Sequence, residues 1–333
     1  MIYPFDSALI TRTQHLPCLA IATLVLMATH ASGQAFPSRP VRLVVPFPAG
    51  GTADVIARAA TNELDRQLGQ PFIIDNRGGA NSIIGSEIVA QAAPDGHTLL
   101  HVTAAFAINP SVYRKLPYKV EDFLPVTNLV VGVGYLLLVH PTLPAQSVTE
   151  LITLAKNRGG QLAYSSPGVG NTLHLAVEYF NFKAGAAMTH VPYKGVAPAL
   201  TALIAGEVQT MLIPPLIAVQ HIKAGRARAL GFTGTKRWAL LPSVPTIAEA
   251  AIPGFNIIGG WHGWFAPAKT PLPIAEKIQS EVYKALQTPK VREYMIEGGY
   301  DTDGRNPAEF RKLVQEEVKR FAEIVRMTKI VPQ

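Results

Sequence analysis

The chain has 333 residues, of which 48 % are hydrophobic and 16 % are charged, and its formal net charge is +7. This length suits two domains, and so apolar a composition excludes a disordered chain. The basic residues are scattered rather than grouped in runs. We therefore expect no nucleic-acid partner, and a mild positive field that favours anionic small molecules.

The first predicted element is a targeting segment at the N-terminus. Residues 16–28 form a mostly apolar run that follows Arg12 and is too short to span a bilayer comfortably. Small residues come next, which predicts a signal peptide over residues 1–35 with cleavage after Ala35; a signal anchor is the alternative. The single cysteine, Cys18, lies inside this segment. The mature chain would therefore have no thiol for disulfides, metals or nucleophilic attack.

A strand, a glycine loop and a helix form the next predicted unit. Residues 41–46 are apolar and β-branched like a buried strand, residues 47–52 form a Pro/Gly turn, and a helical period starts at Ala53. This unit directs backbone N–H groups and the positive end of a helix dipole to one point, which suits an anion. Thr52 or Asp54 can cap the helix. The loop lacks GxGxxG and GK[ST], so neither a dinucleotide site nor a P-loop is expected.

Alternating strands and helices continue to the C-terminus and predict two α/β lobes with parallel sheets. The expected strands are 71–75, 98–102, 161–165, 188–192, 208–213 and 227–232. The expected helices are 53–68, 81–92, 147–157, 172–182, 197–205, 217–224, 272–286 and 307–325. Two long strands that contain glycines, 128–140 and 255–265, would carry the chain between the lobes.

These two strands predict that one lobe is inserted into the other. The first lobe is expected at residues 36–134 plus 257–333, and the second lobe at residues 135–256. A cleft between such lobes is the expected ligand site and hinge.

A second Gly/Pro loop, residues 166–171, repeats the design of the first loop in the other lobe. Ser165, Ser166, Asn171 and Thr172 add hydroxyl and amide groups to its backbone N–H groups. Two such loops on facing lobes would hold the two ends of one ligand. His174 follows inside the next helix, where a structural or ligand hydrogen bond fits better than catalysis, because no orienting acid or nucleophile is evident.

Further motifs are few. The sequence has no GxSxG, no HExxH and no paired His/Cys spacing, so we expect no catalytic group, metal or organic cofactor. Lys194 is either an anion contact or an exposed turn lysine. Trp261 lies on the return strand, where it either packs in the core or lines the cleft.

Long strings of the sequence resemble the Bug-type receptors, the extracytoplasmic solute-binding proteins of tripartite tricarboxylate transporters. They include PSRPVRLVVPFPAGGTADVIAR, DNRGGANSIIGSEIVAQAAPDGHTLL, YSSPGVGNTLHLAVEYF, VPYKGVAPALTALIAGEV and WHGWFAPAKTP. The resemblance covers essentially the whole mature chain in order. It implies a periplasmic-binding-protein type II fold, in which two lobes joined by two crossing strands close on a ligand in the periplasm, without enzyme activity.

In this family the two loops clasp a carboxylate largely through backbone groups and ordered water. The resemblance and the residues together give one set of expected ligand-binding positions. They are Phe47, Ala49, Gly50, Gly51, Thr52, Asp54, Ser165, Ser166, Gly170, Asn171, Thr172, His174, Tyr193, Gly195 and Trp261.

Two departures from the family pattern bear on the ligand. Many members carry Gly where this chain has Val196, and many carry an acidic residue where it has Ile213. An uncompensated ammonium is costly to bury, so Ile213 disfavours an amino-acid ligand. Val196 would narrow the pocket or present an apolar wall.

The expected function is therefore that of a monomeric receptor. It would capture a small organic carboxylate, a di- or tricarboxylate or an aromatic carboxylate rather than an amino acid, and deliver it to a two-subunit integral membrane permease. The alternatives are a periplasmic sensor component that presents its ligand to a membrane kinase, and a periplasmic enzyme that acts on a carboxylate.

Overall fold

The computed structural model describes Met1 and residues 36–257, 259–328 and 330. The predicted signal peptide lies outside these residues, apart from Met1. The described residues from Arg39 onward belong to one compact unit. Within the described ranges, no helix is long and apolar enough to cross a bilayer.

A six-stranded mixed sheet forms the centre of the first lobe, in the order β11-β4-β10-β3-β1-β2. Its strands are β1 (Val41–Val45), β2 (Phe72–Asn76), β3 (Thr98–Thr103), β4 (Phe123–Gly132), β10 (Trp261–Pro267) and β11 (Tyr300–Thr302). β1 pairs in parallel with β2 and β3, whereas β10 runs antiparallel between β3 and β4. After the second lobe, the chain therefore returns to the first lobe as β10, a central strand of its sheet. All seven residues of β10 are buried.

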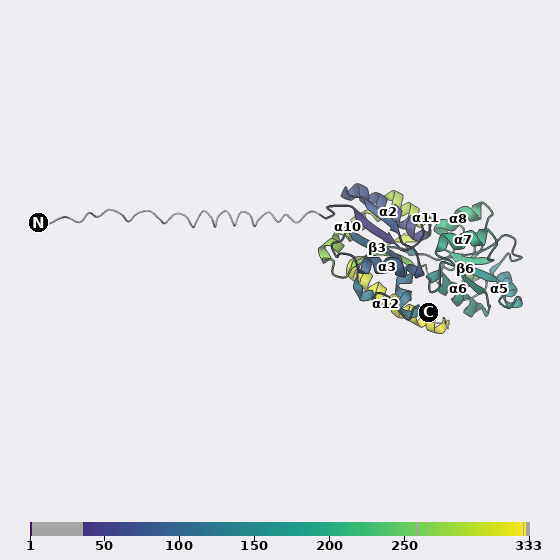
Figure 1. Ribbon diagram of the computed structural model, residues 1–333. Coiled ribbons are helices and arrows are strands. Elements are labelled where there is room, and N and C mark those ends of the chain that lie inside the picture. Colours follow the sequence, from purple (N-terminus) through teal and green to yellow (C-terminus); the bar gives the residue numbers. More distant parts are fainter. Residues whose placement is uncertain (2–35, 258, 329, 331–333) are drawn as a thin grey trace. The chain divides into compact units, whose positions relative to one another are not determined.

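Helices cover both faces of this sheet (Figure 1). They are α2 (Thr52–Leu68), α3 (Ile83–Ala90), α4 (Ala105–Val112), α10 (Leu272–Gln287), α11 (Pro289–Glu297) and α12 (Pro307–Met327), with short 3-10 turns η1 (Ala80–Ser82) and η2 (Val120–Asp122). α2 packs with α10 and α11, and α12 packs with α4, so that the two groups of helices enclose the sheet. Phe106, Phe265 and Phe310 lie in the apolar cluster beneath α12.

A five-stranded sheet forms the centre of the second lobe, in the order β7-β6-β8-β5-β9. Its strands are β5 (Leu136–Val139), β6 (Ala163–Ser166), β7 (Thr189–Pro192), β8 (Thr210–Ile213) and β9 (Arg228–Phe232). The helices are α5 (Val148–Asn157), α6 (Thr172–Ala184), α7 (Val196–Ile204), α8 (Pro215–Lys223) and α9 (Ile247–Ala250). One apolar cluster involves α5, α6 and α9, and the other involves α7 and α8, which places a core on each face of the sheet.

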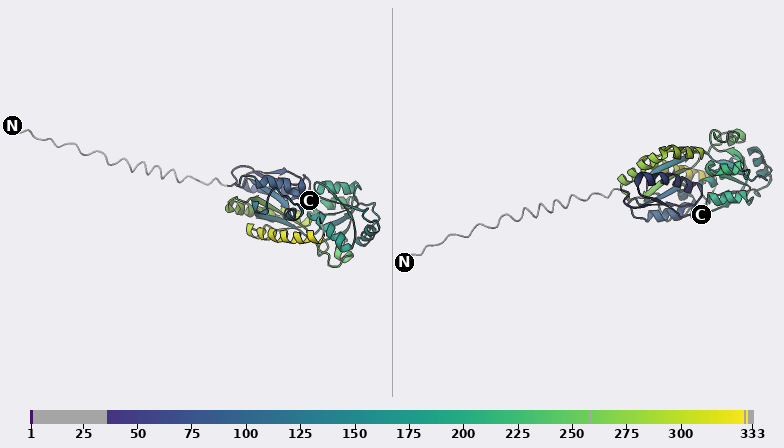
Figure 2. Two further views of the ribbon diagram at one scale, coloured as in Figure 1. Left: turned by 60° about the horizontal axis from the view of Figure 1, so that its bottom comes forward. Right: turned by 90° about the horizontal axis from the view of Figure 1, so that it is seen from above.

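Two chain segments join the lobes, from β4 to β5 and from β9 to β10, and they are bonded to each other. Tyr135 N–H donates to Thr233 Oγ1 over 2.8 Å, and Gly132 N–H donates to the Gly260 carbonyl over 3.0 Å. A Cβ on Gly132 would lie 2.9 Å from Gly259 Cα, so only glycine lets the two segments approach this closely. Figure 2 shows both lobes from two further directions.

The predicted two-lobed α/β architecture is confirmed, whereas the exact domain boundaries stay a prediction. Ser147 caps α5 as its sequence indicates, with its side chain accepting from Glu150 N–H. The long strand expected over 128–140 is instead β4 and β5, which belong to different sheets. The strand expected over 255–265 begins only at Trp261. The helices α4 and α11 and the strand β11 had no clear sequence signal.

Candidate functional site

A small central cavity of about 40 Å³ lies where the first and second lobes meet. Its lining residues are Phe47, Pro48, Gly51, Thr52, Ala53, Thr103, Tyr135, Pro167, Asn171, Thr172, Leu173, Val196, Pro214, Gly260, Trp261, His262 and Tyr300. None of the described residues in this wall is a lysine, an arginine, an aspartate or a glutamate. Any charge preference of this cavity must therefore come from backbone dipoles and neutral side chains.

Four helices begin at the wall of the central cavity. α2 begins at Thr52, α6 at Thr172 and α7 at Val196, while α8 follows its N-cap Pro214, and all four residues line the cavity. The positive ends of these helix dipoles thus meet at one place, which favours an anion. The first turn of α2 has no side-chain cap in the part of the chain that the structure describes, so its N–H groups are available to a ligand.

Two buried donors in the cavity wall have no hydrogen-bond partner among the described residues. They are the Thr52 hydroxyl and Trp261 Nε1–H, and each side chain belongs to a residue that is only 3 % exposed. A third wall group, the Tyr135 hydroxyl, accepts from Gly260 N–H over 2.6 Å. Burial raises the pKa of Tyr135, so this hydroxyl stays protonated near neutral pH. Unpaired buried donors are costly unless a ligand satisfies them.

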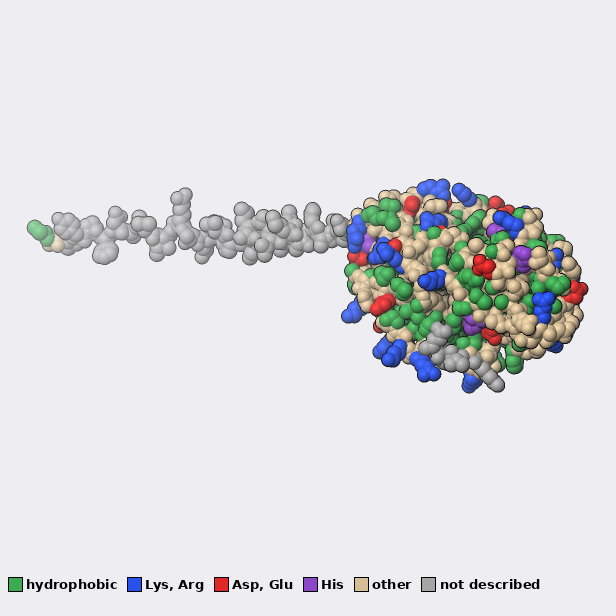
Figure 3. Space-filling model, turned by 45° about the vertical axis from the view of Figure 1, so that its right-hand side comes forward, with side chains coloured by type: hydrophobic (Ala, Val, Ile, Leu, Met, Phe, Trp, Pro, Cys, Tyr) green, Lys and Arg blue, Asp and Glu red, His purple; other side chains and the backbone are tan. Residues whose placement is uncertain are grey.

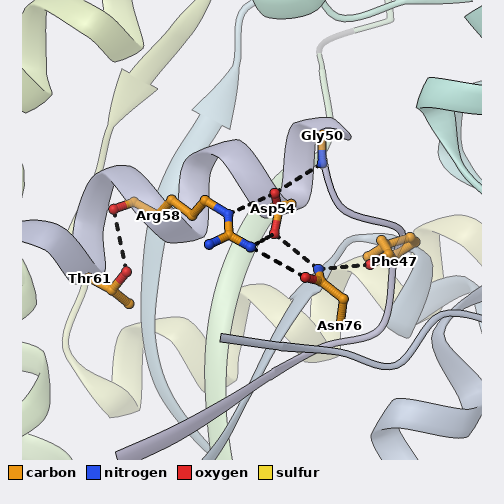
Figure 4. A network of polar contacts seen from close by, with 6 residues as sticks. All are labelled: Phe47, Gly50, Asp54, Arg58, Thr61 and Asn76. Carbon is orange, nitrogen blue, oxygen red and sulfur yellow. Dashed lines mark hydrogen bonds and ion pairs between the residues drawn. The ribbon is translucent and has the colours of Figure 1, made fainter. Parts of the chain in front are cut away.

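The Asp54 carboxylate fixes the first loop from behind (Figure 4). It accepts from Gly50 N–H over 3.0 Å, from Arg58 Nε over 2.9 Å and from Asn76 Nδ2 over 3.0 Å. Asn76 Nδ2 also donates to the Phe47 carbonyl over 3.0 Å. Burial alone would raise the pKa of Asp54, but the hydrogen bonds from Arg58, Gly50 and Asn76 outweigh it and the pKa is lowered. Asp54 therefore holds the loop and does not line the cavity.

The second loop is held by its own set of side chains. Gly168 N–H donates to Ser166 Oγ over 3.2 Å, and Gly170 N–H donates to His174 Nδ1 over 3.1 Å. His174 stacks on His190 with 4.0 Å between the ring centroids. Burial lowers the pKa of His174 to about 3 and that of His190 to about 4, so both rings are neutral. Neutral His174 is thus able to accept the loop N–H group, which a protonated ring cannot do.

Ser166 and His190 form a contact that the sequence did not indicate. Ser166 Oγ lies 2.5 Å from His190 Nε2, which is the spacing of a nucleophile and a general base. Ser166 is fully buried and does not line the central cavity, and its hydroxyl also donates to the Gly168 carbonyl over 3.1 Å. The contact therefore closes the loop on itself and presents no nucleophile to a ligand.

The structure brings part of the predicted site together at the central cavity. The predicted residues in the wall are Phe47, Gly51, Thr52, Asn171, Thr172 and Trp261. The predicted residues outside the wall are Ala49, Gly50, Asp54, Ser165, Ser166, Gly170, His174, Tyr193 and Gly195.

The residues outside the wall have identifiable positions. Ser165 Oγ is buried and donates to the Ala199 carbonyl over 3.0 Å, while Ala49 is exposed. Tyr193 and Gly195 line a separate loop cavity of about 140 Å³, as does the exposed Lys194. This loop cavity shares Phe47, Pro48 and Pro167 with the central cavity, so the two cavities are neighbours along the loops.

Several wall residues were missed by the sequence reasoning, although a signal for them exists. Thr103 ends β3, Pro167 follows β6, and Pro214 follows β8. Ligands of open α/β sheets bind outside the carboxyl ends of the strands, so the residue after each parallel strand is a candidate. Tyr300 and His262 come from antiparallel strands late in the chain, and no local pattern marks them.

The expectation that Ile213 faces the ligand is wrong, because this residue does not lie in the cavity wall. Its side chain is fully buried, belongs to the apolar cluster around α7 and α8, and does not line the cavity. Side chains alternate along β8, and the next residue, Pro214, occupies the wall instead. Val196 does line the cavity, as an apolar wall residue. Among the described residues, the wall thus carries no acidic group, as expected, but the residue that lines it at this point is Pro214 and not Ile213.

Polar contacts cross between the lobes beside the cavities. Tyr113 Oη donates to the Val169 carbonyl over 3.2 Å, and Asn171 Nδ2 donates to Asn81 Oδ1 over 3.4 Å. Asn81 lies in a turn with positive φ angles, which the buried Asn109 side chain holds by donating to the Asn81 carbonyl over 3.0 Å. Among the described residues, no cluster of three or more His, Cys, Asp or Glu side chains could hold a metal ion.

Residues 56–330 match the family model described as tripartite tricarboxylate transporter family receptor. Protein BugT of Bordetella pertussis is 35 % identical over 305 residues, covering 91 % of this chain and 93 % of BugT. A solved structure of Rpa4515 from R. palustris with adipate has a TM-score of 0.86 and 35 % identity, covering 90 % of this chain and all of that one. MatC from Rhodopseudomonas palustris with bound malate has a TM-score of 0.81 and 34 % identity, covering 87 % of this chain and all of that one.

Proposed function

Because the chain belongs to the tripartite tricarboxylate transporter receptor family, we propose that it captures a small organic carboxylate between its lobes and delivers it to a membrane transporter. The family assignment makes it a solute-binding receptor. The nature of the ligand, the mode of capture and the delivery step are the parts that we add.

The observation that carries this proposal is the central cavity with four helix N-termini and no charged side chain in its wall. Backbone N–H groups bind a carboxylate through charge-assisted hydrogen bonds, which are about twice as strong as neutral ones. Since the two lobes supply different N-termini, the full set of donors would be available only when the lobes are closed. Binding would therefore stabilise the closed form.

The wall supports a carboxylate ligand over an amino acid. No acidic side chain lines the cavity, so an ammonium group would be buried without a counter-charge. Val196, Pro214 and Trp261 offer apolar and aromatic surface to the body of the ligand. The adipate and malate in two solved relatives are carboxylates without an ammonium group, which supports the same class.

Delivery would take place outside the cytoplasmic membrane. We propose that the chain is exported by its N-terminal segment, acts as a monomer in the periplasm and docks on a two-subunit integral membrane permease. The family description as a transporter receptor supports this role. No catalytic step is part of the proposal.

A thermal-shift screen of the protein purified from the periplasm tests the ligand class. The panel contains adipate, malate, succinate, citrate, benzoate, terephthalate, aspartate and glutamate. A ligand at a hundred times its Kd adds about 2.7 kcal/mol to the free energy of unfolding, which raises Tm by several degrees. We expect a shift with at least one acid that lacks an amino group and none with aspartate or glutamate. A shift with the amino acids alone would overturn the ligand class.

A wall variant ties such a shift to the central cavity. Thr52→Val removes an unpaired buried hydroxyl and keeps the shape, so we expect affinity for the tightest acid to fall about fivefold to tenfold. Thr153→Val, on the exposed face of α5, is the matched control and should bind like the wild type. Equal affinities of both variants would place the ligand elsewhere.

A turnover test separates the receptor proposal from the alternative of a periplasmic enzyme that acts on a carboxylate. Incubation of the protein with each bound acid, followed by mass spectrometry, should return the acid unchanged. Product formation that Ser166→Ala abolishes would replace the receptor proposal by an enzymatic one.

A further inference from the structure

Three buried rings form a hydrogen-bonded chain that ends at the central cavity. Trp264 Nε1–H donates to His101 Nδ1 over 2.8 Å, and His101 Nε2 lies 3.2 Å from His262 Nδ1. Trp264 and His101 are fully buried, and His262 is 5 % exposed and lines the cavity.

The strand register gives this chain of rings a direction. His262 on β10 lies opposite Thr103 on β3, and both residues line the cavity. Trp264 lies opposite His101, two residues further from the cavity on each strand. The chain Trp264–His101–His262 therefore runs from the core of the first lobe to the ligand site.

The hydrogen bonds determine where the ring protons are. An indole N–H can only donate, so His101 Nδ1 must carry a lone pair and the proton of His101 must be on Nε2. That proton points at His262 Nδ1, which must then accept. The proton of His262 is consequently on Nε2. The tryptophan thus selects the tautomer of the second histidine through the first.

Burial supports this assignment by keeping both rings neutral. Burial lowers the pKa of His101 to about 3, and burial together with the nearby His101 lowers the pKa of His262 well below its usual value. No lysine, arginine, aspartate or glutamate lines the cavity beside His262. Neutral rings, each with one donor and one acceptor nitrogen, are the forms that this chain of hydrogen bonds requires.

His262 Nε2 is the ring nitrogen that does not take part in the bond to His101. It lies across the ring from Nδ1, so it is directed away from His101 and the core. The Thr52 hydroxyl and Trp261 Nε1–H are unpartnered in the same wall. The wall therefore holds the unpaired Thr52 hydroxyl and Trp261 Nε1–H together with His262 Nε2–H, and the last two groups can only donate.

We propose that Trp264 and His101 fix His262 as an obligate hydrogen-bond donor to the ligand, which makes His262 a residue that determines specificity for an acceptor such as a carboxylate. Trp264 and His101 are positioning residues that act through His262. This inference rests on the proposed receptor function. A ligand ammonium at the same point would face His262 Nε2–H, and since both groups only donate, both would be left without an acceptor.

Nitrogen-15 NMR of the histidine rings tests the tautomer without any ligand. In the full chain labelled with nitrogen-15, long-range proton–nitrogen correlations distinguish a protonated from an unprotonated ring nitrogen, and the His262→Gln variant identifies the His262 signals. We expect Nε2 of His262 to be protonated and Nδ1 unprotonated at pH 7. Trp264→Phe removes the fixed donor, so the His262 nitrogens should shift toward values averaged over both tautomers. A His262 protonated on Nδ1 in the wild type would overturn the proposal.

Ligand affinity tests the role in specificity, with succinate and aspartate as a matched pair of probes and adipate as a third. His262→Phe should lower affinity for the tightest acid about tenfold or more. His262→Gln, whose amide can donate or accept, should narrow the preference for succinate over aspartate. His140→Phe, outside the cavity, is the control and should leave both measurements unchanged.

The outcomes separate this inference from the receptor proposal. If the wild type binds no acid in the panel, the proposed function fails, while the NMR result still decides the tautomer. If the wild type binds an acid and His262→Phe binds it equally well, the inference fails and the receptor proposal stands. If His262→Phe does not fold, the His262→Gln measurement and the NMR spectra of the wild type and Trp264→Phe decide the question.

Discussion

His101 links the stability of the first lobe to pH. It is fully buried and has a pKa of about 3, because burial penalises the charged ring. In the unfolded chain its pKa returns to about 6.5, so protonation favours unfolding. The contribution of the neutral ring is complete above about pH 6.5 and is lost as the pH falls from there toward 3. The slope for one such group is at most about 1.4 kcal/mol per pH unit.

We therefore expect Tm of the wild type to fall between pH 7 and pH 5, and to fall less steeply in His101→Gln. His140→Gln, outside the core clusters, should keep the wild-type slope. Differential scanning calorimetry at four pH values measures both slopes. A slope for His101→Gln equal to that of the wild type would show that the ring is charged in the folded protein or that it opens before global unfolding.

Asp54 determines the shape of the first loop, so its substitution should affect affinity as well as stability. Asp54→Asn keeps the size of the side chain but turns an NH₂ group or a weaker acceptor toward Gly50 N–H, Arg58 and Asn76. We expect a loss of about 1–3 kcal/mol in the free energy of unfolding, together with weaker ligand binding. Urea unfolding and calorimetric titration measure the two effects.

The matched control for Asp54→Asn is Glu63→Gln on the same helix. Glu63 pairs with Arg66 near the C-terminal end of α2, away from the loop. A surface pair of this kind contributes at most about 1 kcal/mol, so ligand affinity should not change. Unchanged ligand affinity in Asp54→Asn would refute the positioning role.

At the scale of elements, β10 and α12 pack so closely that one glycine decides their separation. A Cβ on Gly263 would lie 2.2 Å from Phe310 Cζ in the middle of the first-lobe core. Gly263→Ala should therefore force the ring of Phe310 or the helix to move, at a cost of about 1–3 kcal/mol or more. Chemical denaturation monitored by circular dichroism measures this loss.

Gly69→Ala separates packing from backbone strain. Gly69 caps α2 with φ of 65°, and a Cβ added there would meet no other atom within 4 Å. Its substitution therefore costs only the left-handed conformation, about 1 kcal/mol. A Gly263→Ala variant no less stable than Gly69→Ala would mean that α12 does not press on β10.

The elements themselves were predictable where the sequence signal is local. The boundaries of α6, α10 and α12 follow from an apolar helical period with a cap or a proline at the start. Those of α2 follow from the helical period after a Pro/Gly turn, although neither Thr52 nor Asp54 caps the helix. α4 was not predictable, because its buried residues lie all round the helix, it contains Pro110 and it is buried by its packing against α12. Its helical state depends on a helix far along the chain, which no local period records.

The residues of the candidate site likewise divide into those with a local sequence signal and those without one. Phe47, Gly51, Asn171 and Thr172 lie on glycine loops that the sequence marks directly. His262 and the other wall residues of antiparallel strands reach the cavity only through the register of β10 and β11 with strands much earlier in the chain. Asp54 and His174 are expected ligand-binding positions through the family resemblance, and for His174 a structural hydrogen bond is the alternative. Their side chains instead bond the loops from behind, which spacing cannot distinguish.

At the scale of the whole molecule, we expect the paired crossing segments to limit how the lobes move relative to each other. Gly132 and Gly259 touch where the two segments lie side by side. Gly132→Ala should push the segments apart, and so reduce ligand affinity and the ligand-dependent change in radius of gyration. Small-angle X-ray scattering with and without the tightest acid measures that change.

Gly225→Ala is the control for the hinge. Gly225 has φ of 68° with open space around it, so its substitution should lower stability by about 1 kcal/mol and leave the scattering response intact. A Gly132→Ala variant whose scattering response equals that of the wild type would exclude a hinge at this contact.

The surface charge of the molecule is consistent with attraction of anions over distance. Lysine and arginine side chains are scattered among acidic ones on the face in Figure 3, without a single basic patch. With a formal net charge of +7, such a surface raises the local concentration of small anions mildly and in a salt-dependent way.

The meeting of four helix N-termini at the central cavity affects how mutations can change the ligand that the cavity prefers. The attraction of the cavity for an anion arises from peptide dipoles and not from one charged side chain. The substitution of a single side chain in the wall therefore does not remove it. Substitutions at wall positions such as Val196 and Pro214 would change the shape of the cavity without removing these dipoles. We therefore expect a few wall substitutions to change which acid the cavity accepts while its attraction for an acid remains.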